Sequence, residues 1–146
     1  MAPATSLSNL PLQVLLYLNG WYDIVYVVLM LVLFIWKAHE LPWPGAEMER
    51  LFALEVCLVI LLGIVEYCRI FLASRGNKTE SYVPLILSIV LSVLSITGFY
   101  YFVMRQVYVT RLDVILGSIG LGFIGLELLL SLLVVVSLIR APPRVA

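Results

Sequence analysis

Four carboxylates and one guanidinium lie inside long apolar stretches of this sequence, where the surrounding medium would be hydrocarbon. Glu55, Glu66 and Arg69 fall in one stretch, and Asp23 and Glu127 fall in two others. A charged side chain at the centre of a bilayer costs about 2.5 to 3.5 kcal/mol on insertion scales, so such residues pair with one another or mark a path for ions or protons. The chemistry that these residues offer is therefore ion pairing within a membrane or proton transfer.

The usual combinations for catalysis are missing from the sequence. A single histidine among 146 residues removes the commonest general base, and no glycine-rich phosphate loop or nucleophile-base pair is visible. Cys57, Cys68 and His39 do not have the spacing of metal ligands. Basic residues are scattered, which gives nucleic-acid binding no support. We expect no enzyme activity, no catalytic residues, no cofactor and no metal.

The charged positions are carried by four apolar stretches, each of which reaches the ~20 residues that a helix needs to cross a bilayer. Hydrophobic residues make up 63% of the chain and charged residues 12%, which leaves too little polar surface for a soluble globule. We therefore predict an all-α polytopic membrane protein, a four-transmembrane-helix bundle forming a single domain over residues 1–146 with no soluble domain. The predicted helices cover roughly residues 12–36, 51–73, 83–104 and 112–139. Alternatively, residues 11–19 lie along the interface and turn inward at Asn19-Gly20.

The polar residues of the first two helices fall on single faces. Glu55, Glu66 and Arg69 are spaced 11 and 3 apart and share one stripe, while Asn19, Asp23 and Tyr26 repeat at i, i+4, i+7. Antiparallel packing brings Asp23 to the depth of Arg69, which predicts a structural cluster that holds the helices together. An ion or proton path is the alternative. The predicted intramembrane polar cluster comprises Asn19, Asp23, Glu55, Glu66 and Arg69.

Small residues form a row on each of the last two helices. Small side chains let helices approach closely within lipid, where lateral hydrophobic attraction is absent. We predict that the two rows face each other. They are Ser88, Ser92 and Ser95 on the third helix and Ser118, Gly122 and Gly125 on the fourth.

Glu127 lies about 180° around the fourth helix from this row, on the side that carries Gly120 and Ser131. Three arrangements remain open for this carboxyl group. Either the group is protonated, or it contacts the first two helices, or it becomes buried only when another protein docks. We take Gly120, Glu127 and Ser131 as a candidate partner-facing surface.

Basic residues in the connections give a nearly even count on the two sides of the membrane. The side with both termini carries Arg75, Lys78, Arg140 and Arg144, and the other carries Lys37, Arg50, Arg105 and Arg111. Adding Arg69, which can extend toward the first side, favours cytosolic termini by the positive-inside rule. The glycosylation tripeptide at Asn77 argues for the reverse, and we interpret it as a chance match.

Three strings of the sequence, taken together and in order, resemble a known family. They are Pro11-Leu12 with Tyr17-Leu18-Asn19-Gly20-Trp21-Tyr22, Glu66-Tyr67-Cys68-Arg69-Ile70-Phe71 with Arg75-Gly76-Asn77, and Gln106-Val107-Tyr108-Val109-Thr110-Arg111-Leu112-Asp113-Val114. The family is that of transmembrane proteins 216 and 80, and the likeness covers roughly residues 11 to 135. Ala73 departs from it, because the family is expected to carry glycine there.

This resemblance implies a tetraspan, non-enzymatic component of the ciliary transition zone. Its implied partners are tectonic-type membrane proteins and coiled-coil or C2-type scaffold proteins, within a complex that limits diffusion between ciliary and plasma membranes and supports cilium assembly. The alternative function is a small proton- or cation-coupled transporter or channel that uses Glu55, Glu66 and Glu127.

Overall fold

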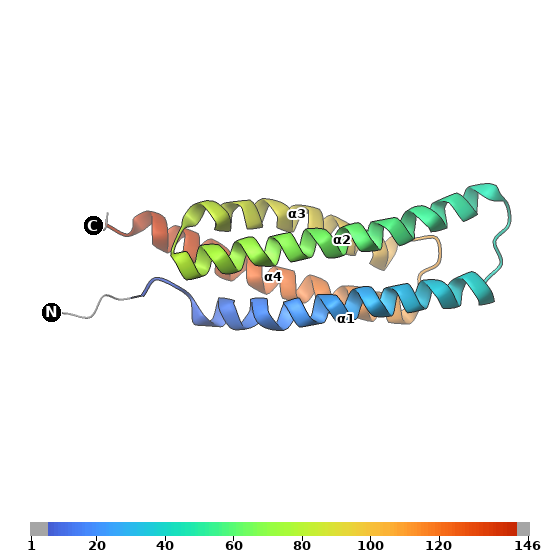
Figure 1. The fold of residues 1–146 in the computed structure, drawn as a ribbon, viewed down its shortest axis with the longest axis horizontal. Coiled ribbons are helices and arrows are strands. Elements are labelled where there is room, and N and C mark those ends of the chain that lie inside the picture. The colour runs from blue at the N-terminus through green and yellow to red at the C-terminus, as the bar shows by residue number, and fades with distance from the viewer. Residues whose placement is uncertain (1–5, 143–146) are drawn as a thin grey trace.

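The computed structural model describes residues 6–142 and consists of four antiparallel helices (Figure 1). They are α1 (Leu10–Glu40), α2 (Ala46–Thr79), α3 (Tyr82–Met104) and α4 (Arg111–Arg140). Helices consecutive in sequence pack side by side, and α4 closes the ring against α1. The described chain begins and ends at the same end of the bundle, as four crossings require.

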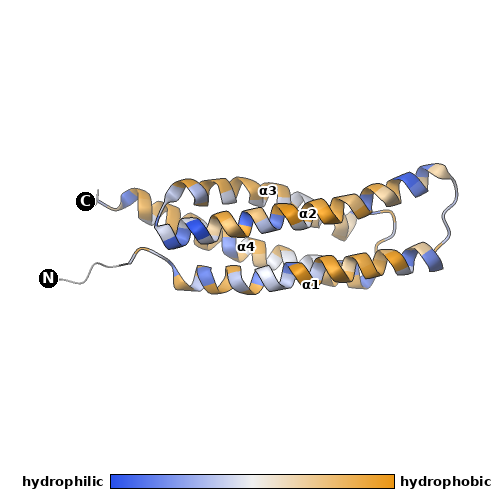
Figure 2. Cartoon of the chain, in the orientation of Figure 1, coloured by the Kyte–Doolittle hydropathy of each residue, from blue (hydrophilic) through white to orange (hydrophobic). Residues whose placement is uncertain are grey.

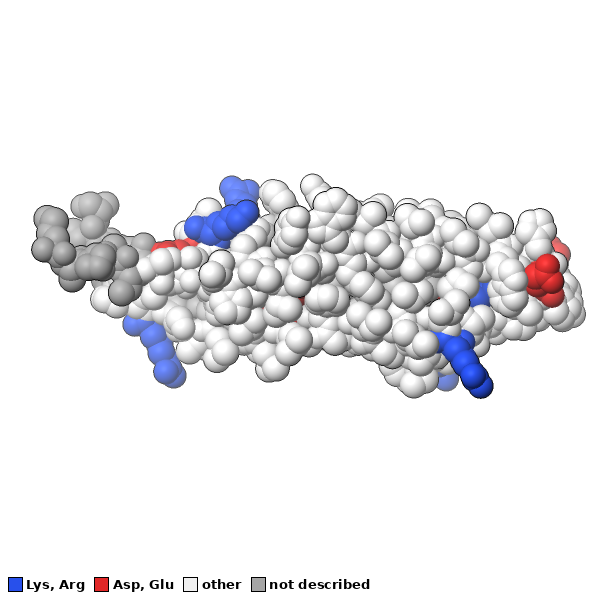
Figure 3. Space-filling model, turned by 90° about the horizontal axis from the view of Figure 1, so that it is seen from below, with Lys and Arg blue, Asp and Glu red and all other residues white. Residues whose placement is uncertain are grey.

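All four helices are long and apolar enough to cross a membrane. Figure 2 shows apolar residues along most of each helix, and Figure 3 shows charged side chains near the two ends of one face with an almost uncharged surface between them. The surface of this middle region is formed by large apolar side chains such as Val28, Leu61, Val93 and Leu129. Lipid chains are the solvent that such a surface fits.

The helices are longer than the apolar stretches that predicted them. At 1.5 Å per residue, the 31 residues of α1 and the 34 of α2 span about 46 and 51 Å, well beyond the ~30 Å of hydrocarbon. Both helices extend past the connection between α3 and α4 (Figure 1). α1 runs without interruption through Gly20, so residues 11–19 belong to the first helix and do not form a separate interfacial segment.

Local sequence accounts for the helix ends. Asn9 caps α1 by accepting a hydrogen bond from the Leu12 amide, and Pro11 lies in the first turn, where a helix has no use for its missing N–H. Thr110 and Asp113 form a reciprocal capping box at the start of α4. At the end of α2, Glu80 adopts a left-handed conformation with φ 52°, which allows the chain to turn into α3 within two residues.

Asn77, the asparagine of the glycosylation tripeptide, is buried and joins the start of α1 to the end of α2. Asn77 Oδ1 accepts from the Asn9 amide at 2.8 Å, and its Nδ2 donates to the Asn9 carbonyl at 2.9 Å. One turn deeper, Gln13 Nε2 donates to Ser74 Oγ at 2.8 Å. Asn77 is 2% exposed, and its side-chain amide is bonded to the Asn9 backbone through both its oxygen and its nitrogen.

The prediction that the two small-residue rows face each other is wrong. Ser88, Ser92 and Ser95 are buried as a row on α3, but Ser118 and Gly122 are exposed on α4. Apart from the backbone of α4 and the adjacent residues, no atom of residues 6–142 lies within 4 Å of the place where a Cβ on Gly122 or Gly125 would be. The spacing of Ser118, Gly122 and Gly125 places them on one face of the helix. Spacing alone does not distinguish a face that packs closely against a neighbouring helix from one that faces lipid.

The close approach of α3 and α4 instead occurs at Gly117 and Gly120. A Cβ on Gly117 would lie 2.3 Å from Val103 Cγ2, and one on Gly120 would lie 2.5 Å from Phe99 Cε1. Phe99 is completely buried, with its ring centroid 4.8 Å from that of Tyr26. Part of the hydrophobic core is therefore built around the Phe99 ring, which packs directly against the backbone of Gly120.

We predict that Gly120→Ala destabilises the bundle by about 1 to 3 kcal/mol, because the added methyl group overpacks against Phe99. Gly122→Ala is the matched control on the same helix, where the methyl group meets open space. Thermal unfolding in detergent measures both. Equal stabilities of the two variants would contradict the packing described here.

Candidate functional site

Five polar residues from three helices meet inside the bundle, and we call them the central cluster: Asn19, Asp23, Glu66, Arg69 and Glu127. Arg69 binds the Glu66 carboxylate through two parallel bonds, Nε–Oε1 at 3.0 Å and Nη2–Oε2 at 2.7 Å. Its Nη1 reaches Glu127 Oε2 at 2.7 Å, and Asn19 Nδ2 donates to the same oxygen at 3.3 Å. The side chains of Glu66, Arg69 and Glu127 are each 1% exposed.

The guanidinium of Arg69 is the group that joins the helices at this depth. Its planar fork matches a carboxylate in two-point contact and still leaves a donor for a second acid. Through Glu127 and Asn19 it ties α2 to α4 and α1. α3 is attached by Ser88, whose hydroxyl donates to the Arg69 carbonyl oxygen at 3.0 Å. All four helices thus converge on one residue.

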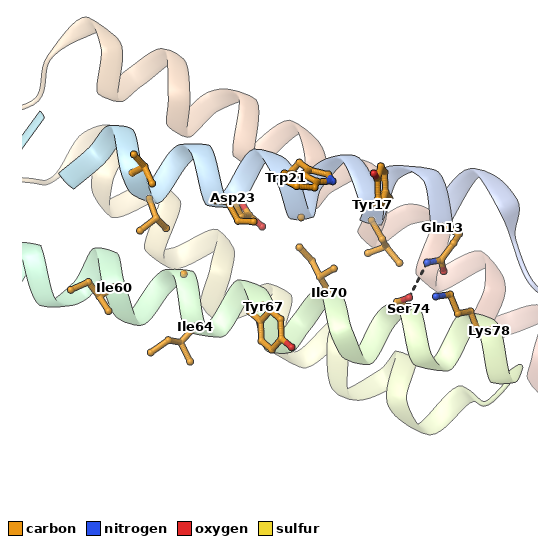
Figure 4. A pocket seen from close by; sticks show the side chains of 16 residues that line it. Gln13, Tyr17, Trp21, Asp23, Ile60, Ile64, Tyr67, Ile70, Ser74 and Lys78 are labelled. Atoms are coloured by element: carbon orange, nitrogen blue, oxygen red, sulfur yellow. Dashed lines mark hydrogen bonds between the residues drawn. The ribbon is translucent and has the colours of Figure 1, made fainter. Parts of the chain in front are cut away.

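Asp23 lies at the edge of this network, next to Glu66. It is 8% exposed, and no N–H or O–H group within residues 6–142 donates to either carboxyl oxygen, although the Glu66 carboxyl group lies at hydrogen-bonding range. Glu66, Arg69 and Glu127 are all close enough to interact with it electrostatically. Figure 4 shows Asp23 on α1 directed into the space between α1 and α2. The structure therefore brings Asp23 to the depth of Arg69 but leaves its carboxyl group facing a groove.

The predicted partner-facing surface on α4 is wrong. Gly120, Glu127 and Ser131 are all buried in the bundle, Glu127 at 1% and Ser131 at 3% exposed. Their face of α4 meets the first two helices at the central cluster and α3 at Phe99. The calculation that put Glu127 opposite the small-residue row was geometrically correct. Which of the two faces points inward was decided by Arg69, because the guanidinium has a second carboxylate to bind only if Glu127 faces it.

Glu55, predicted as a member of the intramembrane polar cluster, lies outside the central cluster, toward the other end of the bundle. Its Oε1 accepts hydrogen bonds from Tyr101 Oη at 3.0 Å and from the Val107 amide at 2.7 Å. It shares the buried stripe of α2 with Glu66, but eleven residues separate them along the helix, which is about 16 Å. Glu55 therefore holds the connection between α3 and α4 against α2.

A second buried ion pair was not predicted from the sequence, in which Lys37 was counted among the basic residues of the first connection. Lys37 is 1% exposed, and its Nζ lies 2.7 Å from Asp113 Oδ2 and 3.2 Å from Gln106 Oε1. It is buried because α1 continues to Glu40 and so passes the start of α4. The capping box could have indicated an acid for Lys37, because it fixes the Asp113 carboxylate at the start of α4.

The buried polar residues join the helices to one another. Within the described range, no group of three or more His, Cys, Asp or Glu residues is placed to hold a metal ion. Each buried cation is bound to at least one buried acid, and these bonds link different helices. Two ion pairs at two depths tie α1 to α4 and α2 to α4, which is what a rigid spanning bundle requires.

The fold and its buried ion pairs define a polytopic membrane protein with four spanning helices. A family model described as "Predicted membrane protein" matches residues 14–124. Transmembrane protein 216 of Mus musculus is 40% identical over 134 residues, which cover 91% of this chain and 92% of the relative. This chain belongs to the transmembrane protein 216 family.

Other relatives extend the same likeness. Transmembrane protein 216 of Homo sapiens is 37% identical over 141 residues, covering 96% of this chain and 94% of the relative. The protein of that name from Danio rerio is 33% identical over 135 residues, covering 92% and 82%. No solved structure matches the chain.

We predict that Arg69→Met lowers the free energy of unfolding by about 3 to 5 kcal/mol, because it leaves two buried carboxylates without their cation. Thermal unfolding in detergent is the measurement, with the exposed Arg75→Met on the same helix as the control. Adding Glu66→Gln and Glu127→Gln to Arg69→Met should restore part of the loss, since it removes the unpaired charges. A triple variant less stable than Arg69→Met would contradict this electrostatic account.

Lys37→Met is expected to destabilise the opposite end of the bundle by about 3 kcal/mol, because Asp113 would remain buried without its cation. The control is Arg111→Met, at the same end and exposed. Backbone hydrogen exchange around residues 106–113 reports the local effect. Unchanged protection of this segment would show that the ion pair does not hold α1 to α4.

Proposed function

We propose that this protein is a non-enzymatic membrane component of the ciliary transition zone. It acts within a tectonic-like complex that restricts diffusion between ciliary and plasma membranes and supports cilium assembly. Its partners are tectonic-type membrane proteins together with coiled-coil or C2-type scaffold proteins. It is multi-pass, lies at the base of the cilium, and has cytosolic termini.

Membership of the transmembrane protein 216 family is the observation that carries this proposal. The identity extends over more than nine tenths of both chains for the mouse relative. A likeness of that extent includes part of every helix of the bundle. We therefore assign the role that the resemblance implies to the whole described chain in this proposal.

The architecture suits assembly within the membrane. The described part of the chain consists of four spanning helices and short connections, the longest of which joins α3 to α4 over residues 105–110. The buried charged side chains Lys37, Arg69, Glu66, Asp113 and Glu127 are paired inside the bundle, and the lateral surface is mainly apolar. Such a protein meets its partners mainly through the sides of its helices.

The transporter alternative needs Glu55, Glu66 and Glu127 along one wet path, and the geometry opposes this. Glu66 and Glu127 share the Arg69 guanidinium, whose positive charge repels cations. Glu55 lies about 16 Å along the helix and accepts bonds from a tyrosine and a backbone amide. These acids are engaged in structural contacts at two separate depths.

Burial of Lys37 also bears on orientation. This lysine cannot count as a free charge of its connection, because it is paired with Asp113 inside the bundle. Of the basic residues that the sequence assigns to the two sides, four then count on the side of the termini and three on the other: Arg75, Lys78, Arg140 and Arg144, the last of which lies outside the described residues, against Arg50, Arg105 and Arg111. The positive-inside rule thus supports cytosolic termini.

The test is localisation and affinity purification of the tagged chain in ciliated cells. We expect the protein at the base of the cilium and enrichment of tectonic-type membrane proteins with it. Arg75→Met, exposed and outside the ion pairs, should behave as wild type, whereas Arg69→Met should reduce both signals through loss of the fold.

Distribution over general endomembranes without such partners would overturn the proposal. A second arm measures proton flux in liposomes that contain the purified chain. Flux abolished by Glu127→Gln would establish the transporter function in its place.

A further inference from the structure

A groove of about 740 Å³ runs between α1 and α2 on the lateral surface of the bundle (Figure 4). Apolar and aromatic side chains form its sides, among them Trp21, Ile24, Ile64 and Tyr67, each more than half exposed. Gly20 also lines it, and nothing lies within 4 Å of where a Cβ on Gly20 would be. The groove is thus open to the lateral surface, apolar, and lies between two spanning helices.

One carboxyl group projects into this groove without an N–H or O–H donor from the described chain. Asp23 lines the groove and is more than nine tenths buried, and neither of its oxygens accepts from an N–H or O–H group of the described chain, since its neighbour at hydrogen-bonding range is another acid, Glu66. A buried polar group that lacks a partner is costly, so most such groups in proteins are satisfied. Asp23 therefore points to a donor that approaches from outside the bundle.

The charges around Asp23 are also unbalanced. Glu66, Glu127 and Asp23 provide three carboxyl groups, and Arg69 provides one guanidinium. The bonds that Arg69 makes with acids go to Glu66 and Glu127, so Asp23 has no cation of its own. An added positive charge at the groove would improve the electrostatic balance of the cluster.

The depth of Asp23 determines what can bring that donor. Gln13 and Lys78 lie at one end of the groove, and Asp23 is ten residues further along α1 than Gln13, about 15 Å. That distance is half the thickness of the hydrocarbon layer. Lipid head groups lie at the interface and lipid chains have no donor, so neither can satisfy Asp23. A polar side chain on another spanning helix can do so.

A second copy of the chain fits less well. A parallel copy related by a twofold axis would bring its own Asp23 to the same depth, which adds another carboxyl group where a cation is needed. A helix with a lysine or arginine at this depth has the opposite charge and complements the groove in shape and charge.

From these observations we propose that the groove between α1 and α2 is the docking site for one transmembrane helix of a partner protein that places a lysine or arginine side chain against Asp23. The inference deepens the proposed function and rests on it for the assembly role. It adds the chemistry of the partner and the surface that receives it.

The test uses the full chain in liposomes with synthetic spanning peptides as probes, and measures energy transfer between labels. One peptide is a leucine-alanine helix with a central arginine, and the other carries leucine at that position. We expect the arginine peptide to bind the wild type roughly 5- to 30-fold more tightly, the range expected for a polar contact between membrane helices. Asp23→Asn should reduce the affinity for the arginine peptide to that for the leucine peptide.

Two glycines provide a matched pair of variants. Gly20→Leu fills the groove and should abolish binding of the arginine peptide, whereas Gly122→Leu adds the same side chain to open space on α4 and should leave it unchanged. Thermal unfolding of every variant shows whether it remains folded. Because Gly20→Leu meets no atom of the chain near its Cβ, it tests the groove even if Asp23→Asn alters the cluster.

Equal binding of the two peptides, or no effect of Asp23→Asn, would overturn the inference. It would also be overturned if differently labelled copies of the chain associated with each other and Gly20→Leu abolished that association. None of these results involves a cilium, so they leave the proposed location intact. Conversely, a protein found outside the transition zone could still bind the arginine peptide.

Discussion

The bundle depends on one arginine that is shared between two acids inside the membrane. Arg69 binds Glu66 on its own helix at two points and Glu127 on α4 at a third, while α3 bonds to its carbonyl oxygen through Ser88. In a membrane, an apolar side chain gains little by exchanging contact with lipid for contact with another helix. Helices therefore need close packing and polar bonds to select their neighbours. The arginine provides that choice. It makes α2 the element against which α1 and α4 are oriented.

The same arrangement explains why the interior and the surface differ. An arginine that satisfies two carboxylates leaves the third, Asp23, at the edge of the cluster and facing the groove. The chain thereby combines a tightly bonded centre with one unmet polar position on an otherwise apolar side. For a protein made of spanning helices and short connections, such a position is where specificity toward another membrane protein can arise, because apolar contact alone hardly distinguishes a helix from lipid.

Helix length controls the second ion pair. α1 and α2 extend past the connection between α3 and α4, so Lys37 is carried into the bundle beside the start of α4. There Asp113 serves both as the capping acid of α4 and as the partner of Lys37. Glu55 completes this end by accepting a bond from the Val107 amide. The connection between α3 and α4 is thus held from two sides by buried polar groups.

The sequence by itself determined the class of protein, the number of helices and the buried stripe with Glu66 and Arg69, because apolar length and helical spacing are local properties of the chain. It also placed Asp23 at the depth of Arg69, since antiparallel packing fixes depth. Only the tertiary structure decided which faces of α3 and α4 meet, that Glu127 points inward and that Lys37 is buried. Small residues at helical spacing suit a lipid-facing side as well as a packed one, and the rotation of a helix about its axis is set by the bonds it makes with its neighbours. Those bonds join residues far apart in sequence, and the spacing within one helix cannot specify them.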